Sequence, residues 1–431
     1  MMAASSIGFA YIIALFFEAI NGFHDTAHGA APMIASGVFG KPIRIYYWWG
    51  HLRHFDIGLH EREVRVFRFL GWNRSFKIEP RYLIPVLIMA FTNFLGAYFG
   101  GTAVALFIPK IIHFAPVPIR LIIAAMLAAA GWNLYSWWRK MPVSSTHCLI
   151  GALTGAGIMA ASQTGVGMDE LLFAVLGLAA APFVAYFCAM PLAKVLKLVL
   201  ARTNTGSAFM QWLLRWLMVL FAAFVGTQHG RGDGQKTMGI LLMISAIAAG
   251  SKTMPTTVPH WIVFLCASCM ALGTLIGARR IITTVGEKLS TKQMTYPDAL
   301  AATATTAAIL YQGANIALPL STTQTATGSV LGAAAGLHNP KALSWEQLKK
   351  LVFGSWSDKP RRLLSFFGFP LPLDKTDSGH VLAATTQTFE EESTMNIDTV
   401  KSMLKMWVQT FATTWFVAQL LYALLTWLNI G

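Results

Sequence analysis

Long apolar stretches, separated by shorter polar segments, follow one another along most of the chain. Each is near or above the roughly 17–25 residues that a helix needs to cross a lipid bilayer. The pattern predicts an all-α membrane protein, a polytopic helical bundle of about 10–12 helices. The stretches lie near residues 5–22, 82–108, 117–138, 170–200, 209–226, 236–250, 258–282, 297–312 and 402–428.

Composition supports this prediction. Of the 431 residues, 55% are hydrophobic and 12% are charged, whereas roughly 25% are charged in an average soluble domain. We therefore expect a multi-pass protein of the cell membrane. The formal net charge of +14 comes from Lys and Arg residues that lie mostly between apolar stretches, as in residues 44–77 and 279–292. That placement is typical of cytoplasmic loops beside lipid headgroups, so the bilayer is an expected partner and nucleic acid is not.

Two polar motifs occur twice, in the same order. The segment NGFHDTAHG (21–29), directly behind the first apolar run, has a partner in TQHGRGDGQKTMG (227–239), and MPVSSTHCLIGALTGAG (141–157) has one in LPLSTTQTATGSVLGAA (318–334). We expect the first motif to lie at the end of an apolar helix. Motifs duplicated in this way are typical of a transporter built from repeats around a site at the membrane midplane.

The second motif of each pair places a proline and a run of hydroxyls before a short segment rich in small residues. Proline favours the first turn of a helix and Ser or Thr favours its N-cap. These segments therefore predict the tips of two re-entrant hairpins. A helix N-terminus with added hydroxyl donors is a ready site for a phosphate-like anion. The alternative is that the hydroxyls only cap a broken helix.

Asp25 and Asp233 occupy matching places in the first pair of motifs. A carboxylate beside a bound anion would repel it and would be costly to desolvate. A cation that occupies or neutralises the aspartates, either Na⁺ or a proton, removes this conflict and couples the two ions in symport. Intramembrane Glu18 allows the same interpretation or a structural hydrogen bond.

His24 and His28 have the i, i+4 spacing of a zinc-binding helix, so an intramembrane metal-dependent enzyme is an alternative. The later copy keeps His229 but has no second histidine four residues on, and no third ligand can be identified. A proton-titrating or hydrogen-bonding role for His24 is the better interpretation, because histidine is the side chain that titrates near neutral pH.

The chain resembles the PiT family of inorganic phosphate transporters. The segments that carry the resemblance are EAINGFHDTA (18–27), PVSSTHCLIGA (142–152), HGRGDGQKTMGI (229–240) and IGARRIITTVGEKLSTKQMTYPDA (276–299). This resemblance implies uptake of inorganic phosphate driven by a co-transported H⁺ or Na⁺, without a further cofactor and without enzyme activity. It also implies an inverted-repeat fold and a homodimer. Sulfate, or a metal-phosphate complex, is an alternative substrate.

The resemblance also implies roles for individual residues. Cation coupling is expected at Asn21, His24, Asp25 and Asp233. Phosphate binding is expected at Thr26, Ser144, Ser145, Thr146, Gln235, Lys236, Ser321, Thr322 and Thr323. The family usually has Asn where this chain has His28, Ala-Asn where it has Arg231-Gly232, and His where it has Gln324. Because His24 adjoins Asp25 and two of the usual Asn carbonyls are missing, we expect protons rather than sodium to drive uptake.

These features divide the chain into five parts. Residues 1–40 and 82–202 form the expected first repeat, and residues 203–337 the second. Residues 41–81 are an aromatic and basic insert, expected to lie at the membrane interface as a helix or a strand pair. Residues 338–400 are expected to form a polar, partly disordered loop, and residues 401–431 a C-terminal transmembrane helix.

Overall fold

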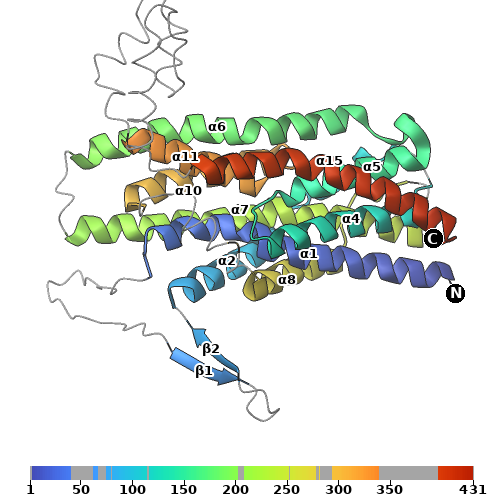
Figure 1. Ribbon diagram of the computed structural model, residues 1–431, viewed down its shortest axis with the longest axis horizontal. Helices are drawn as coiled ribbons and strands as arrows, with labels where there is room; N and C mark the ends of the chain where they lie inside the picture. The colour runs from blue at the N-terminus through green and yellow to red at the C-terminus, as the bar shows by residue number, and fades with distance from the viewer. Residues whose placement is uncertain are drawn as a thin grey trace, which may run out of the picture.

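The computed structural model describes residues 2–39, 62–66, 74–78, 80–113, 116–201, 208–251, 253–277, 281, 294–338 and 397–430. These residues form a bundle of helices that run roughly along the long axis of the molecule (Figure 1), which confirms the predicted all-α membrane fold. The helices are α1 (Met2–Ala35), α2 (Pro80–Phe99), α3 (Ala103–Phe107), α4 (Ile119–Trp138), α5 (Ser145–Ala161), α6 (Met168–Ala201), α7 (Ala208–Ala248), α8 (His260–Gly277), α10 (Tyr296–Asn315), α11 (Thr322–His338) and α15 (Ile397–Trp427). Two 3₁₀ helices, η2 (Ile108–Ile111) and η3 (Ser162–Gly165), join them.

Two helices are longer than the hydropathy pattern predicts. Helix α1 continues through NGFHDTAHG, so the prediction that this motif ends a helix is wrong. Helix α7 has 41 residues and replaces the two separate stretches expected at 209–226 and 236–250. An α-helix satisfies its backbone groups internally, so polar side chains do not end it when neighbouring helices bind them.

Six helices in the described part of the chain are long and apolar enough to cross a membrane. Helix α7, which carries the motif of residues 227–239, helix α10, which is rich in threonine, and helix α11, which has only 17 residues, are not among them. Helix α10 packs against α7 and α11, which places these polar helices within the bundle. The six candidate spans are Ala4–Ala35, Arg81–Phe99, Ile119–Trp138, Met168–Lys197, His260–Gly277 and Lys405–Trp427.

The two hydroxyl motifs fold alike. Helix α4 ends in a turn where Lys140 has a φ of 57°, and α10 ends in one where Ala317 has a φ of 56°. The N–H of Met141 donates to the Ser136 carbonyl, and the N–H of Leu318 donates to the Gly313 carbonyl, each at 2.9 Å. These are the bonds of a Schellman turn. The two turns support the predicted internal repeat, whose boundaries remain a prediction.

Helices α5 and α11 begin at the hydroxyl motifs and have 17 residues each. At 1.5 Å per residue this length is about 25 Å, short of the roughly 30 Å of bilayer hydrocarbon. Each lies close to one neighbouring backbone. A Cβ on Gly155 would meet the Trp415 carbonyl of α15 at 2.1 Å, and one on Gly332 would meet the Tyr186 carbonyl of α6 at 2.3 Å. Glycine at these positions therefore lets each hairpin helix dock.

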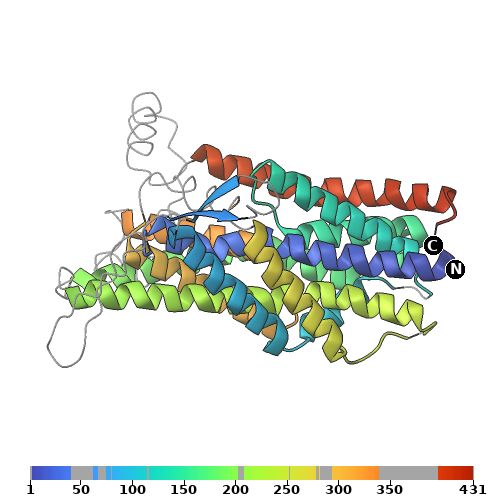
Figure 2. The same cartoon turned by 90° about the horizontal axis from the view of Figure 1, so that it is seen from below.

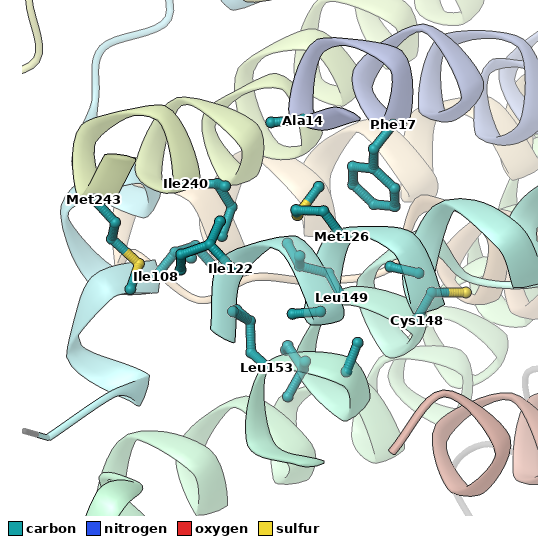
Figure 3. Packing of buried hydrophobic residues seen from close by; sticks show 14 of the residues in the cluster. Ala14, Phe17, Ile108, Ile122, Met126, Cys148, Leu149, Leu153, Ile240 and Met243 are labelled. Carbon is teal, nitrogen blue, oxygen red and sulfur yellow. The ribbon is translucent and has the colours of Figure 1, made fainter. Parts of the chain in front are cut away.

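Apolar packing fixes the helices around the hairpins. Phe17 of α1, Met126 of α4, Leu149 of α5 and Ile240 of α7 belong to one buried cluster (Figure 3). Because residues from four elements interdigitate in this cluster, the polar faces of α1, α5 and α7 have a defined position relative to one another.

The insert contains an antiparallel strand pair, β1 (Arg62–Val66) and β2 (Arg74–Ile78), with Val64 opposite Phe76. It lies beside the helices rather than among them (Figures 1 and 2). A strand pair was one of the two forms predicted for residues 41–81. The rest of this insert, apart from residues 80 and 81 of α2, and residues 339–396 of the predicted polar loop lie outside the described residues.

Candidate substrate and cation site

Asp25 of α1 contacts the tips of both hairpins. Its Oδ2 atom accepts a hydrogen bond from the backbone N–H of Ser145 at 3.2 Å, in the first turn of α5. Its Oδ1 atom accepts one from the Thr323 hydroxyl at 2.9 Å, in the first turn of α11. The two helix N-termini therefore converge on one buried carboxylate, as the positive end of a helix dipole favours.

Lys236 of α7 also connects the two hairpins. Its ammonium donates to the Thr146 hydroxyl and to Asp233 Oδ1, and to the Leu320 carbonyl at 2.9 Å. The Thr322 hydroxyl lies 3.5 Å from Asp233 Oδ2. The structure thus brings Asp233 and Lys236 together with Thr146 and Thr322.

Serine caps both hairpin helices in the same way. The Ser144 hydroxyl oxygen accepts from the backbone N–H of His147 at 3.3 Å, and the Ser321 hydroxyl oxygen accepts from that of Gln324 at 3.3 Å. A serine oxygen that accepts this bond keeps its own O–H free to donate to a ligand. All the predicted hydroxyl residues of the two tips are buried: Ser144, Ser145, Thr146, Ser321, Thr322 and Thr323.

Each aspartate has a histidine neighbour. His24 Nδ1 lies 3.1 Å from Asp25 Oδ1, and its Nε2 lies 3.0 Å from the Ser136 hydroxyl. His229 Nε2 lies 3.3 Å from Asp233 Oδ2. One ligand atom from each of Asp25, His229 and Asp233 lies within 4.8 Å of the other two, so this group can hold a cation.

The zinc interpretation of His24 and His28 has no geometric support. Both ring nitrogens of His24 are engaged by Asp25 and Ser136. His28 is 1% exposed, and its ring nitrogens have no hydrogen-bond partner among the residues that the structure describes. The group that can hold a cation contains His229 of α7 and neither His24 nor His28 of α1.

Three predicted site residues lie elsewhere. Gln235 Oε1 accepts from the N–H groups of Val104 at 2.8 Å and Ala105 at 3.4 Å, so this side chain caps α3. The Thr26 hydroxyl accepts from Asn93 Nδ2 at 2.6 Å and lies 3.1 Å from the Thr274 hydroxyl, between α1, α2 and α8. Asn21 is buried, and its Oδ1 has no hydrogen-bond partner in the described part of the chain. In the described part of the chain, none of the three forms a hydrogen bond with a hairpin tip.

Sequence reasoning missed two amides that position site residues. Asn133 Nδ2 donates to the Ser145 hydroxyl at 2.8 Å, and Asn93 Oδ1 lies 3.0 Å from His229 Nδ1. Each amide stands inside an apolar stretch. A polar side chain in such a stretch is expensive and marks a functional or structural contact, so this signal was available in the sequence.

A membrane bundle in which two short helices point at buried charged groups defines a class of protein, the secondary transporters. Comparison with known proteins gives the family: residues 81–357 match the phosphate transporter family, and the chain belongs to it. It is a transporter rather than an enzyme, and a multi-pass protein of the cell membrane.

Individual relatives agree with this family. The chain is 32% identical over 345 residues to a probable low-affinity inorganic phosphate transporter of Bacillus subtilis, covering 79% of this chain and 89% of that protein. It is 27% identical over 261 residues to the low-affinity inorganic phosphate transporter PitA of Escherichia coli, covering 53% and 44%. A solved sodium-dependent phosphate transporter has the same fold, with a TM-score of 0.66 at 16% identity, covering 98% of this chain and 99% of that one.

Proposed function

We propose that this protein imports inorganic phosphate by symport with a cation, and that the cation is a proton. The observation that carries the proposal is the position of Asp25, which receives one hydrogen bond from each hairpin tip. The point where two helix N-termini meet is suited to bind an anion. The Asp25 carboxylate lies at this point, so it lies where we propose that phosphate binds.

The tips supply what phosphate requires. Buried hydroxyls, backbone N–H groups of helix first turns and the Lys236 ammonium surround this point. Hydrogen bonds from such groups to a charged ligand are roughly twice as strong as neutral ones. The relatives described above are named as inorganic phosphate transporters. Their names favour phosphate over sulfate as the substrate here.

The carboxylate of Asp25 opposes the binding of an anion unless its charge is cancelled. His24, at 3.1 Å, can share a proton with Asp25 and so neutralise the pair before phosphate arrives. Proton binding and phosphate binding would then favour each other reciprocally, which is the thermodynamic basis of coupling.

Sodium is the second candidate cation. Asp25, His229 and Asp233 can hold an ion, and the solved protein with the same fold is sodium-dependent. Sodium prefers oxygen ligands to an imidazole nitrogen, however, and His28 stands where the family usually offers an Asn carbonyl. The homodimer implied by the resemblance remains a prediction.

Uptake into proteoliposomes tests both parts of the proposal. Labelled phosphate is supplied under an inward proton gradient in sodium-free buffer, and separately under an inward sodium gradient at uniform pH. We expect accumulation only under the proton gradient, and no competition by excess sulfate. Accumulation only under the sodium gradient would replace the proton by sodium, and equal competition by sulfate would widen the substrate to oxyanions. Repetition with a metal chelator distinguishes free phosphate from a metal-phosphate complex.

A further inference from the structure

Glu18 of α1 is a buried acid that the proposed transport cycle does not use. It is 0% exposed, and it lies inside the candidate span Ala4–Ala35. Its Oε2 atom accepts a hydrogen bond from the Thr237 hydroxyl of α7. The sequence left two roles open for this residue, cation binding and a structural hydrogen bond, and the bond to Thr237 is compatible with both.

Glu18 has no ion-pair partner in the described part of the chain, where the ion-paired carboxylates are Asp25, Glu170 and Asp233. Lys236 of α7 carries a positive charge that acts on Glu18. Its ammonium, however, donates to Asp233 Oδ1. This positive charge is therefore already engaged by another carboxylate.

The other titratable groups that act on Glu18 bring no positive charge. They are Asp233 of α7 and the thiols of Cys266 and Cys269 on α8. An ionised Glu18 would thus be a buried charge without compensation, which is among the most unfavourable groups that a protein can contain. These surroundings favour the neutral form of Glu18, which carries a proton.

Two buried oxygen atoms support the neutral form. Glu18 Oε1 has no hydrogen-bond partner among the described residues, and neither has Asn21 Oδ1, about one helical turn further along α1. The two side chains interact with each other. A carboxylate oxygen and an amide oxygen both only accept hydrogen bonds. A proton on Oε1 makes this atom a donor to Asn21, so one proton satisfies both atoms.

Glu18 lies beside the residues of the candidate site. A Cβ on Gly234, the residue after Asp233, would lie 3.6 Å from Glu18 Oε1. On α1, Glu18 precedes Asp25 by about two helical turns, so the two side chains project from the same face of the helix. A negative charge at Glu18 would therefore oppose phosphate binding, as a charge at Asp25 does.

We propose that Glu18 is a second proton-binding site and that its proton enters together with phosphate. The carboxylate takes this proton from water on one side of the membrane and returns it to water on the other side. Each phosphate ion then moves with one proton more than the His24–Asp25 pair alone supplies. This inference rests on the proton symport proposed above and extends it to a second residue.

Infrared spectroscopy of the purified full chain tests whether Glu18 binds a proton reversibly. We expect a band from a buried, protonated carboxyl group that is absent in Glu18→Gln and present in Glu170→Gln, which changes a half-exposed acid of α6. Without phosphate the band should weaken as the pH rises, and inorganic phosphate should restore it, because coupled ligands favour each other reciprocally. A band that is absent at every pH, or that never changes, would overturn the proposal. Loss of the band on addition of sodium at constant pH would assign the two oxygen atoms to Na⁺ instead.

Phosphate accumulation tests whether this proton is transported. Proteoliposomes receive labelled phosphate under an inward proton gradient, without sodium and with the membrane potential held at zero. The accumulation ratio contains the proton gradient once for each coupled proton, so a tenfold gradient should give about tenfold less accumulation in Glu18→Gln than in the wild type. Glu18→Asp keeps a titratable group and should restore most of the wild-type ratio. Glu18→Gln can still bond to Thr237 and Asn21, so a purely structural role would leave the ratio unchanged.

The outcomes separate this inference from the proposed function. Equal accumulation by the wild type and Glu18→Gln, both driven by protons, would overturn the second proton site alone. No accumulation by the wild type under the proton gradient would contradict proton symport itself and this inference with it. A folded Glu18→Gln variant that no longer exchanges phosphate without a gradient would place Glu18 in phosphate binding, which would also overturn the proposal.

Discussion

Asp25 and Asp233 occupy matching positions in the two copies of one motif, but their partners differ in the fold. Three residues after Asp233, Lys236 places an ammonium on its Oδ1 atom. Three residues after Asp25 stands His28, whose ring nitrogens bind no described residue. Asp25 is held instead by dipoles, namely the Ser145 N–H, the Thr323 hydroxyl and His24.

The sequence predicts one role, cation coupling, for both aspartates, and this difference in partners leads us to expect a different role for each. Asp233 already has a compensating charge on its own helix, so we expect the pair with Lys236 to hold the hairpins together and to present an ammonium to phosphate. Asp25 has no permanent counter-charge, and a buried carboxylate in that position binds a cation most readily when an anion approaches. We therefore expect cation coupling at Asp25 rather than at Asp233.

The largest effect is expected from Asp25→Asn. Asn keeps the shape of the side chain but removes its charge, so concentrative uptake of labelled phosphate should fall to background. Exchange of phosphate across the membrane without a gradient should persist, because the hairpin hydroxyls remain. Asp169→Asn, which changes an exposed carboxylate at the start of α6, is the control and should transport normally. Accumulation by Asp25→Asn at the parent level would remove Asp25 from coupling.

Breaking the ion pair between Asp233 and Lys236 should chiefly lower the stability of the protein. Lys236→Gln leaves Asp233 buried without its ammonium, and removal of one partner from a buried ion pair costs about 3–5 kcal/mol. The double variant Asp233→Asn with Lys236→Gln should recover most of that loss in unfolding experiments on detergent-purified protein. His28→Gln, at the matching position on α1, should change stability little. A similar loss for both positions would show that the two aspartates are held alike.

The capping serines are expected to contribute to phosphate affinity in both hairpins. In Ser144→Ala combined with Ser321→Ala, each lost hydroxyl bond to a charged ligand should weaken binding by roughly 1.5–3 kcal/mol. Loss of the caps should also reduce stability by about 1 kcal/mol each, so unfolding is measured on the same samples. Ser251→Ala, an exposed serine after α7, is the control. An unchanged dissociation constant would move the substrate site away from the tips.

The smallest effect on transport is expected from Gln235→Leu. Its carbonyl caps α3 rather than facing the hairpins, so the substitution should lower the unfolding free energy by about 1–3 kcal/mol. Phosphate affinity, measured by equilibrium binding, should stay within about twofold, a difference well under 1 kcal/mol. A large loss of affinity in a stable variant would restore the role that the family motif implies.

The hairpins were predictable because their signal is local. Proline, hydroxyls and small residues set the start of α5 and α11 through capping chemistry that operates over a few residues. The continuity of α1 and α7 was not predictable from hydropathy, since a window average falls at Asp25 or Asp233 even though the backbone remains helical. The hydrogen-bond partners of those aspartates include residues of other helices, which a window along one segment does not contain.

The direction in which a side chain points on its helix was the second feature that the sequence did not predict. Asp233, Gln235 and Lys236 share one motif, yet on a helix of 3.6 residues per turn Gln235 points away from the face that Asp233 and Lys236 share. Motif membership gave their positions in the chain, and only the packing of α3 against α7 showed which of them meets the hairpins.

Proton entry at the His24–Asp25 pair can be measured directly. Proteoliposomes containing a pH-sensitive dye receive external phosphate in sodium-free buffer and, in a separate sample, in sodium-containing buffer. Lumenal acidification is recorded together with labelled phosphate uptake. For the wild-type protein we predict acidification in step with uptake, and for His24→Asn we predict the loss of both. Phosphate accumulation that proceeds without acidification, requires sodium and is indifferent to His24→Asn would contradict proton coupling at this pair.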